Sequence, residues 1–128
     1  MTIFHFKSNE MIFILPFITP GLNGPDGLMR QHFHKTKPLK DKLTALILSQ
    51  RPRGHCVITA PCRVTYIRHT STLMDWDNAC ASFKHIGDAL VAAKIIVDDN
   101  PTVLAEFIPK QIKCKRKEHK TQIIIEVL

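Results

Sequence analysis

Two patterns of apolar residues follow one another in the first half of this chain, and each predicts a different element. Residues Met11 to Ile18 are almost continuously apolar and rich in Ile and Phe, which is typical of a buried strand that ends at Pro20 and Gly21. A helical pattern follows from about Lys37 to Gln50, where Pro38 suits the first turn. One face of this predicted helix is apolar and consists of Leu39, Leu43, Leu46 and Ile47.

The second half of the chain repeats this order. A strand is predicted from Cys56 to about Arg68, and because Pro61 has no N–H for a sheet ladder, we expect an edge position or a bulge there. A helix from about Asn78 to Ala93 has the i, i+3, i+4 spacing of a core-facing stripe. The stripe consists of Phe83, Ile86, Gly87, Leu90 and Val91. Two strands, about Val103 to Ile112 and Thr121 to Val127, then predict a C-terminal hairpin.

These elements fit one small domain that includes the whole chain, residues 1–128. Their order predicts an α/β or α+β fold, with one mixed β-sheet covered by two main helices and a C-terminal β-hairpin. The longest apolar run contains a proline and is too short to span a bilayer, and no cleavage site follows it. We therefore expect a cytoplasmic protein with no membrane partner, in which the four scattered cysteines are free thiols rather than zinc ligands.

Charge changes this picture by favouring a polyanionic partner. Eighteen Lys and Arg against eleven Asp and Glu give a formal charge of +7, which suits nucleic acid or an anionic membrane surface. No amphipathic anchor or lipidation motif is evident, so nucleic acid is favoured, although charge alone is equally compatible with a merely basic protein. The candidate phosphate-binding residues are Arg30, Lys35, Lys37, Lys40, Arg68, Lys113, Lys115, Arg116, Lys117 and Lys120. The last five form the hairpin connection, which a solvated turn would explain equally well.

Several acids are placed where they could serve phosphodiester chemistry. That reaction needs charge neutralisation and an activated water, and a hard divalent cation held by a few carboxylates supplies both. Asp75 and Asp77 lie two residues apart where strand gives way to helix, so extended geometry would point both side chains to one side. Lys84 shares a helical face with Asp77, and Asp98 and Asp99 follow the helix after a short apolar segment.

Each of these features also has a structural interpretation. Asp77 suits a helix cap, and Lys84 with Asp88 suits an i, i+4 surface pair. The run from Asp98 to Pro101 suits a turn. Taken singly the structural interpretations are favoured, whereas the acids together with the positive charge suggest a metal site.

The segment DWDNACASFKHIGDAL from Asp75, followed by VAAKIIVDD up to Asp99, resembles the signature of the RusA family of Holliday junction resolvases. The likeness lies in D-x-D-N, a lysine six residues after the asparagine, D-A-L, and a D-D pair beyond the helix. The clear match covers about Asp75 to Asp99, with weaker agreement over the preceding strand and the hairpin after it. Two departures are Trp76 between the first acids and the lack of a dense basic run before Asp75, where only Arg68 and His69 stand.

The resemblance implies a homodimeric endonuclease of bacterial or phage origin that nicks paired strands at four-way DNA junctions during recombination and repair. It implies Mg²⁺ as cofactor, with Mn²⁺ expected to substitute. Asp75, Asp77 and Asp99 would be the essential metal-binding carboxylates, Asp98 the less certain member of its pair, and Lys84 the catalytic lysine. A two-fold protein would present two active sites to a two-fold substrate.

Three other functions remain open from the sequence. The first is a nuclease with another specificity, such as flaps, replication forks or RNA. The second is a DNA-binding module that has lost catalysis and keeps the acids as caps and turns. The third is a partner-binding protein with no role in nucleic acid. Binding of Mg²⁺ distinguishes the first from the second, and failure to bind any DNA would favour the third.

Overall fold

The structure is a computed structural model that describes residues 10–21 and 33–128, with side chains in the second range from residue 37 onward. One mixed sheet forms its framework, with the strand order β1-β4-β2-β3. β1 and β2 each pair antiparallel with β4, whereas β2 and β3 pair in parallel. The strands are β1 (Glu10–Leu15), β2 (Cys62–Thr70), β3 (Leu104–Lys113) and β4 (Lys120–Val127).

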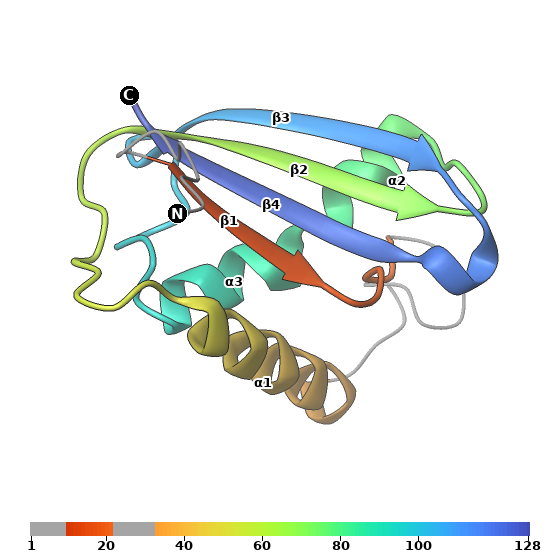
Figure 1. Cartoon of the computed structure of the whole chain (residues 1–128), viewed down its shortest axis with the longest axis horizontal. Coiled ribbons are helices and arrows are strands. Elements are labelled where there is room, and N and C mark those ends of the chain that lie inside the picture. Colours follow the sequence, from red (N-terminus) through yellow and green to blue (C-terminus); the bar gives the residue numbers. More distant parts are fainter. Residues whose placement is uncertain (1–9, 22–32) are drawn as a thin grey trace, which may run out of the picture.

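The helices lie on one side of this sheet. Figure 1 shows α1 (Phe33–Gln50) and α3 (Lys84–Ala92) against the same face, with the short α2 (Trp76–Ala81) near the end at which β2 and β3 finish. A 3₁₀ turn, η1 (Arg116–Glu118), lies between β3 and β4. The predicted small α+β domain, a mixed sheet covered by two main helices, is therefore confirmed. In the described ranges no helix has the length and apolarity needed to cross a membrane.

The core lies between the sheet and these helices because alternate strand residues point to the same face. From the helices it receives the predicted stripes, including Leu43 and Ile47 of α1 and Ile86 and Leu90 of α3, all fully buried. From the sheet it receives one face of three strands. These side chains are Phe13, Leu15, Val64, Tyr66, Ile123 and Ile125.

Two strands differ from the sequence expectation because of their place in the sheet. β1 is an edge strand covered on one side, so Ile12 and Ile14 are 39% and 46% exposed and the expectation of a fully buried strand is wrong. Pro61 was expected to mark either an edge position or a bulge, and β2 is not an edge strand, because it lies between β4 and β3. Pro61 precedes the first ladder residue, and the expected irregularity follows as a register shift between Cys62 and Arg63.

The predicted helix from Asn78 to Ala93 is two helices, with a break at Ser82 and Phe83. The hydroxyl of Thr19 donates to the carbonyl of Ser82, and the Ser82 hydroxyl bonds Tyr66 Oη at 2.6 Å. The Ser82 carbonyl, which would accept an intrahelical hydrogen bond in a continuous helix, is thus bonded to a side chain instead. α1 begins before the predicted start, so Pro38 lies inside the helix rather than in its first turn.

The two C-terminal strands are present and are joined by the basic connection. They run antiparallel, but β2 lies between them in the sheet. Each strand of this open hairpin therefore bonds to β2 rather than to the other.

Candidate metal and nucleic-acid site

Asp75 and Asp77 lie at the start of α2, and residues 71–74 separate them from the end of β2. Because Asp77 is already in the helix, the pair does not have the extended geometry that the sequence predicted. Both residues are exposed. Asp75 is the N-cap residue, with φ −59° and ψ 151°, yet its carboxylate forms no capping hydrogen bond. The carboxylate of Asp77 accepts a hydrogen bond from the backbone N–H of Asn78 at 2.9 Å. The acid pair is thus formed on the surface, and Asp77 also takes part in the helix start.

The basic connection, residues 113–120, contacts the end of β2 and the loop that leads to this acid pair. Because β2 and β3 are parallel, their carboxyl ends meet at one edge of the sheet, and the segments that follow them lie together (Figure 1). The backbone N–H of Cys114 donates to the carbonyl of Thr70 at 3.0 Å. Nε2 of His119 accepts from the backbone N–H of Ser71 at 3.0 Å and bonds the Ser71 hydroxyl at 2.9 Å. These bonds fix the basic connection against the loop that leads into Asp75.

The cations of this connection are exposed and uncompensated. Among the described side chains, the ion pairs join Lys37 to Asp41, Lys84 to Asp88, and Arg63 to two glutamates, so none involves residues 113–120. Exposed charges without a protein partner remain available to phosphates. The exposed cations are Lys113, Lys115, Arg116, Lys117 and Lys120.

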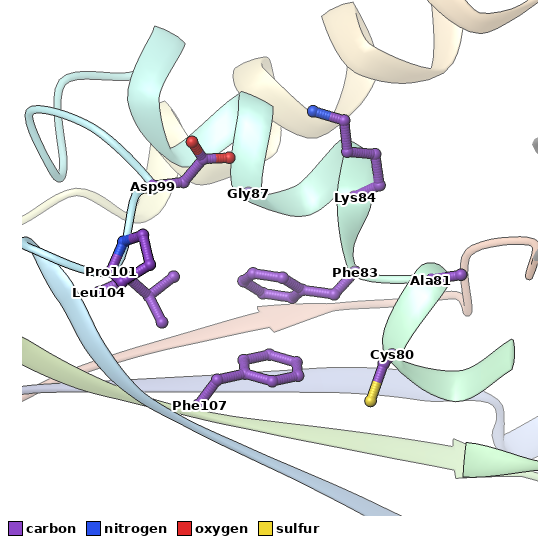
Figure 2. A pocket seen from close by; sticks show the side chains of 9 residues that line it. All are labelled: Cys80, Ala81, Phe83, Lys84, Gly87, Asp99, Pro101, Leu104 and Phe107. Carbon is purple, nitrogen blue, oxygen red and sulfur yellow. The ribbon is translucent and has the colours of Figure 1, made fainter. Parts of the chain in front are cut away.

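Asp99 lies in a different place, at a pocket of about 560 Å³ among α2, α3 and the start of β3. Figure 2 shows its carboxylate directed toward α3 at Gly87, with the rings of Phe83 and Phe107 inside the pocket. A Cβ at Gly87 would lie 3.3 Å from Oδ2 of Asp99, so glycine leaves room for the carboxylate. The ring centroids of Phe83 and Phe107 are 4.8 Å apart, which makes this a mainly apolar pocket with charged groups at its border.

Lys84 also borders the pocket but is engaged within its own helix. Its ammonium donates to Asp88 at 3.0 Å, which is the i, i+4 pair that the structural interpretation expected. This hydrogen bond, with the charges of Asp88 and Asp99, raises the pKa of Lys84. Lys84 therefore stays protonated across the physiological range and can act as a fixed cation.

Asp98 and Asp99 have separate roles. Both carboxylate oxygens of Asp98 are used locally, since Oδ1 accepts from the backbone N–H of Asp99 at 2.7 Å and Oδ2 accepts from Nδ2 of Asn100 at 3.0 Å. Oδ1 of Asn100 in turn accepts from the backbone N–H of Thr102 at 3.0 Å. Asp98 thus builds the turn, whereas Asp99 faces the pocket.

The structure does not bring all the candidate carboxylates together. Asp77 lies four residues, or about 6 Å along the helix axis, before Ala81, which lines the pocket. The pocket itself then separates this turn from Asp99. Across the described part of the chain, no three side chains of His, Cys, Asp or Glu form a group that could hold a metal ion. The arrangement is a surface acid pair, Asp75 and Asp77, with Asp99 and Lys84 apart from it.

The remaining basic candidates fall into three groups. The side chains of Arg30 and Lys35 lie outside the described residues. Lys37 and Lys40 are exposed on α1, where Lys37 pairs with Asp41 at 2.8 Å. Arg68 was predicted to bind phosphate, and the structure does not support this role. It is only 4% exposed, and its guanidinium donates to the carbonyl of Thr19, so it is not available to DNA.

The alternation along β2 could have revealed this role of Arg68 in the sequence. Arg68 is in phase with Val64 and Tyr66, both buried, so it points to the core side of the sheet. There it joins a buried polar network in which Thr19 also contacts Ser82. The network ties the segment after β1 to β2 and to the break between α2 and α3, and so positions the helix that carries Asp77.

No protein-family model matches the chain, and no curated protein sequence is significantly similar to it.

Proposed function

We propose that this protein is a cytoplasmic, Mg²⁺-dependent endonuclease for branched DNA, which acts as a homodimer on four-way junctions in the manner of RusA-type resolvases. One observation carries the proposal: two exposed carboxylates, Asp75 and Asp77, follow a loop that is hydrogen-bonded to an exposed basic connection, whose cations have no ion-pair partner among the described residues. A metal ion on the acids and phosphates on the cations would place a phosphodiester between them.

The donor set fits Mg²⁺, which binds proteins through one or two carboxylates and takes its other ligands from water and substrate phosphate. Asp75 and Asp77 would hold the ion. Bound there, it would supply a Lewis acid that activates water and stabilises the leaving 3′ oxygen. The cations of residues 113–120 would fix the flanking backbone of the strand. Lys84 would offset negative charge on the phosphate from the border of the pocket.

Trp76 supports a branched rather than a fully paired substrate. Its side chain is 56% exposed between the two acids. An exposed indole beside a phosphate-binding surface can stack on an unpaired or unstacked base, and such stacking is worth about 1–3 kcal/mol per base. Bases at a branch point are easier to unstack than those within a duplex.

The direct test is cleavage of an end-labelled four-way junction and a matched linear duplex, with Mg²⁺ or with EDTA. We expect paired, symmetric, Mg²⁺-dependent nicks in the junction. Asp77→Asn should lower the cleavage rate by at least about 100-fold, since metal-ligand loss removes several kcal/mol of transition-state stabilisation. Junction affinity should persist or rise, because a negative charge near phosphate is removed.

The matched control is Glu118→Gln, which neutralises an exposed acid in the basic connection itself. It changes the same charge but leaves the acid pair intact, so at a protein concentration that saturates the junction it should cleave at the rate of the unsubstituted protein. Normal cleavage by Asp77→Asn would contradict the proposal. Asp99→Asn reports whether Asp99 joins the same ion, which would require a change in the angle between α2 and α3.

A catalytically inactive DNA-binding module is the second candidate, and the separation of Asp99 from the acid pair favours it. Such a module would bind the junction tightly and cut neither substrate. Calorimetric titration with Mg²⁺ separates the two, because binding that is lost in an Asp75→Asn, Asp77→Asn double variant supports the metal site. No heat of binding in either protein would favour the module.

A further inference from the structure

The pocket among α2, α3 and the start of β3 has an apolar wall that the proposed reaction does not use. Its volume of about 560 Å³ lies within the range of about 300–1,000 Å³ that is typical of small-molecule sites. Phe83 and Phe107 supply two aromatic rings to this wall, and their centroids are 4.8 Å apart. Because the rings contact each other, a planar ligand would lie against them rather than between them.

Two opposite charges stand at the border of this pocket. Figure 2 shows Asp99 and Lys84 on either side of Gly87, with both rings on the side toward the sheet. Among the described residues, the Asp99 carboxylate has neither a hydrogen bond nor an ion pair, so both of its oxygens are free to accept. Lys84 donates to Asp88, and its ammonium has two further N–H groups. A ligand in this pocket thus meets acceptors at one end and a cation at the other.

Gly87 keeps the space between the carboxylate and the rings open. A Cβ at this position would lie 3.3 Å from Oδ2 of Asp99 and 3.3 Å from Cε1 of Phe83. The edge of a planar ligand that rests on the ring and reaches Asp99 would pass through this gap. Glycine is unfavourable inside a helix, so its presence in α3 is consistent with a need for this space.

The two charges decide which planar ligand fits. A cationic ligand would suit Asp99 alone, but Lys84 and the formal charge of +7 oppose it. A carboxylate only accepts hydrogen bonds, so it selects a ring edge with adjacent donors. Among the nucleobases only guanine presents two adjacent donors on its pairing edge, which are N1–H and the 2-amino group. A nucleotide also carries the phosphate that a lysine binds as a point cation.

We propose that this pocket binds a guanine base, whose ring lies against Phe83 and Phe107 while Asp99 accepts from N1–H and from the 2-amino group. Lys84 binds the phosphate of the same nucleotide. The base comes either from a free guanine nucleotide or from an unpaired guanine of a DNA strand, because an extruded base presents the same edge. The inference does not rest on the proposed function, since it requires neither a metal ion nor cleavage.

The first experiment is calorimetric titration of the full chain with guanosine monophosphate in EDTA. We expect binding, and inosine monophosphate, which lacks only the 2-amino group, should bind at least about ten-fold more weakly, because one carboxylate oxygen loses its hydrogen bond. Adenosine monophosphate should bind more weakly still, because it places an acceptor against the carboxylate. Absence of guanosine monophosphate binding, or equal binding of the three nucleotides, overturns the proposal.

Asp99→Asn separates recognition of the base from a structural role. The asparagine amide accepts from N1–H but donates where the carboxylate accepted, so it fits xanthine, which has a carbonyl in place of the 2-amino group. The variant should lose at least about ten-fold in affinity for guanosine monophosphate and bind xanthosine monophosphate more tightly than the unsubstituted protein does. Loss of guanine binding without the gain for xanthine would count against Asp99 as the group that reads the base.

The matched control for this charge is Asp41→Asn. It removes an exposed carboxylate from α1, where Asp41 pairs only with Lys37 among the described residues. Both nucleotide affinities should therefore stay unchanged. A loss of guanine binding in this control equal to that of Asp99→Asn would show a general effect of charge instead of recognition.

Gly87→Ala tests the position of the base without changing any charge. The added methyl group fills the gap between Asp99 and Phe83, and alanine suits a helix better than glycine. We expect a folded protein, verified by circular dichroism, whose affinity for guanosine monophosphate is at least about ten-fold lower. Unchanged affinity would place the nucleotide outside this pocket.

Fluorescence anisotropy in EDTA distinguishes the two sources of the base. Labelled thymine-rich single strands with a central guanine or a central adenine are titrated with the protein, and guanosine monophosphate is then added as competitor. Tighter binding of the guanine strand, reversed by the competitor, assigns the pocket to a base of DNA. Equal binding of the two strands, with guanosine monophosphate binding retained, assigns it to the free nucleotide. Because no Mg²⁺ is present, these results are distinct from a failure of cleavage.

Discussion

His85 is the residue whose burial has the clearest consequence for stability. It is 7% exposed on α3, and its Nε2 has no hydrogen-bond partner among the described residues. Burial lowers the pKa of His85; the charge of Asp88 opposes this shift in part, and the charges of Lys84 and Lys40 add smaller lowering effects. His85 is therefore neutral in the folded protein at pH values where the unfolded chain already binds a proton.

The lowered pKa of His85 predicts a loss of folding stability in acid. Because the folded pKa lies below the ordinary value of 6.5, the contribution of His85 is fully present above that pH and declines as the pH falls toward the folded pKa. His85→Leu should lose less free energy of unfolding than the unsubstituted protein between neutral pH and about pH 5.5. Urea denaturation of both proteins at the two pH values measures this difference. An equal loss in both would contradict the prediction.

The buried network around Arg68 shows a related principle. Arg68 and Tyr66 were placed by the same strand alternation: Nη1 of Arg68 donates to the carbonyl of Thr19 and Oη of Tyr66 bonds the Ser82 hydroxyl, whereas Nε of Arg68 has no partner among the described residues. A buried charge is tolerated where such partners exist and is costly where they do not. Arg68 therefore serves the position of α2 rather than contact with DNA.

At the scale of the element, the end of α3 stores strain. Lys94 has φ 62°, in the left-handed region that usually takes glycine. The backbone N–H of Ile95 donates to Leu90 at 3.0 Å and that of Lys94 donates to Val91 at 3.0 Å, which together form a Schellman motif with Lys94 at the C′ position. The motif turns the chain toward Ile96, which forms an isolated parallel β-bridge with Ile58.

Lys94→Gly should raise the free energy of unfolding by about 1 kcal/mol, because glycine adopts this conformation without a Cβ clash. Lys94→Ala is the control, since it removes the charge and the long side chain but keeps the Cβ. Denaturant titration of the three proteins at one pH checks the order. A stability of the glycine variant equal to that of the alanine variant would show that the conformation carries no strain.

At the scale of the whole molecule, the exposed charges that we expect to bind DNA contribute little to the stability of the fold. The basic connection is exposed and has no described ion-pair partner, whereas the acid pair is fixed by α2 and β2. Exposed charges far from other features affect stability by less than about 0.5 kcal/mol. They dominate affinity for DNA, because each neutralised phosphate releases counterions.

Replacing Lys115, Arg116 and Lys117 by Gln should therefore leave the unfolding free energy almost unchanged. Junction affinity should fall, and the slope of log K against log salt should become shallower by up to about 2.7, at about 0.9 per phosphate contact. Fluorescence anisotropy over a salt series measures both quantities. Arg53→Gln is the control for an exposed cation in the loop after α1, where it should leave the slope unchanged. A salt-independent affinity would argue against phosphate binding altogether.

The sequence by itself determined the elements and the local chemistry, because both depend on residues close together in the chain. The apolar stripes of α1 and α3 appear in the core, Asp75 and Asp77 lie at the start of a helix, and Lys84 pairs with Asp88. The turn around Asp98 follows from its own side chain and that of Asn100. Periodicity and side-chain hydrogen bonding within a few residues are sufficient for such inferences.

Only the tertiary structure decided the features that depend on strand order. The strand order places β2 between β3 and β4, makes β1 an edge, and leaves Ile12 and Ile14 on a face that no described helix covers. The parallel pairing of β2 and β3 brings the basic connection against the loop that precedes Asp75, while a pocket separates Asp77 from Asp99. These relations join residues far apart in the chain, and long-range pairing is selected by how all the apolar faces pack together rather than by any local pattern.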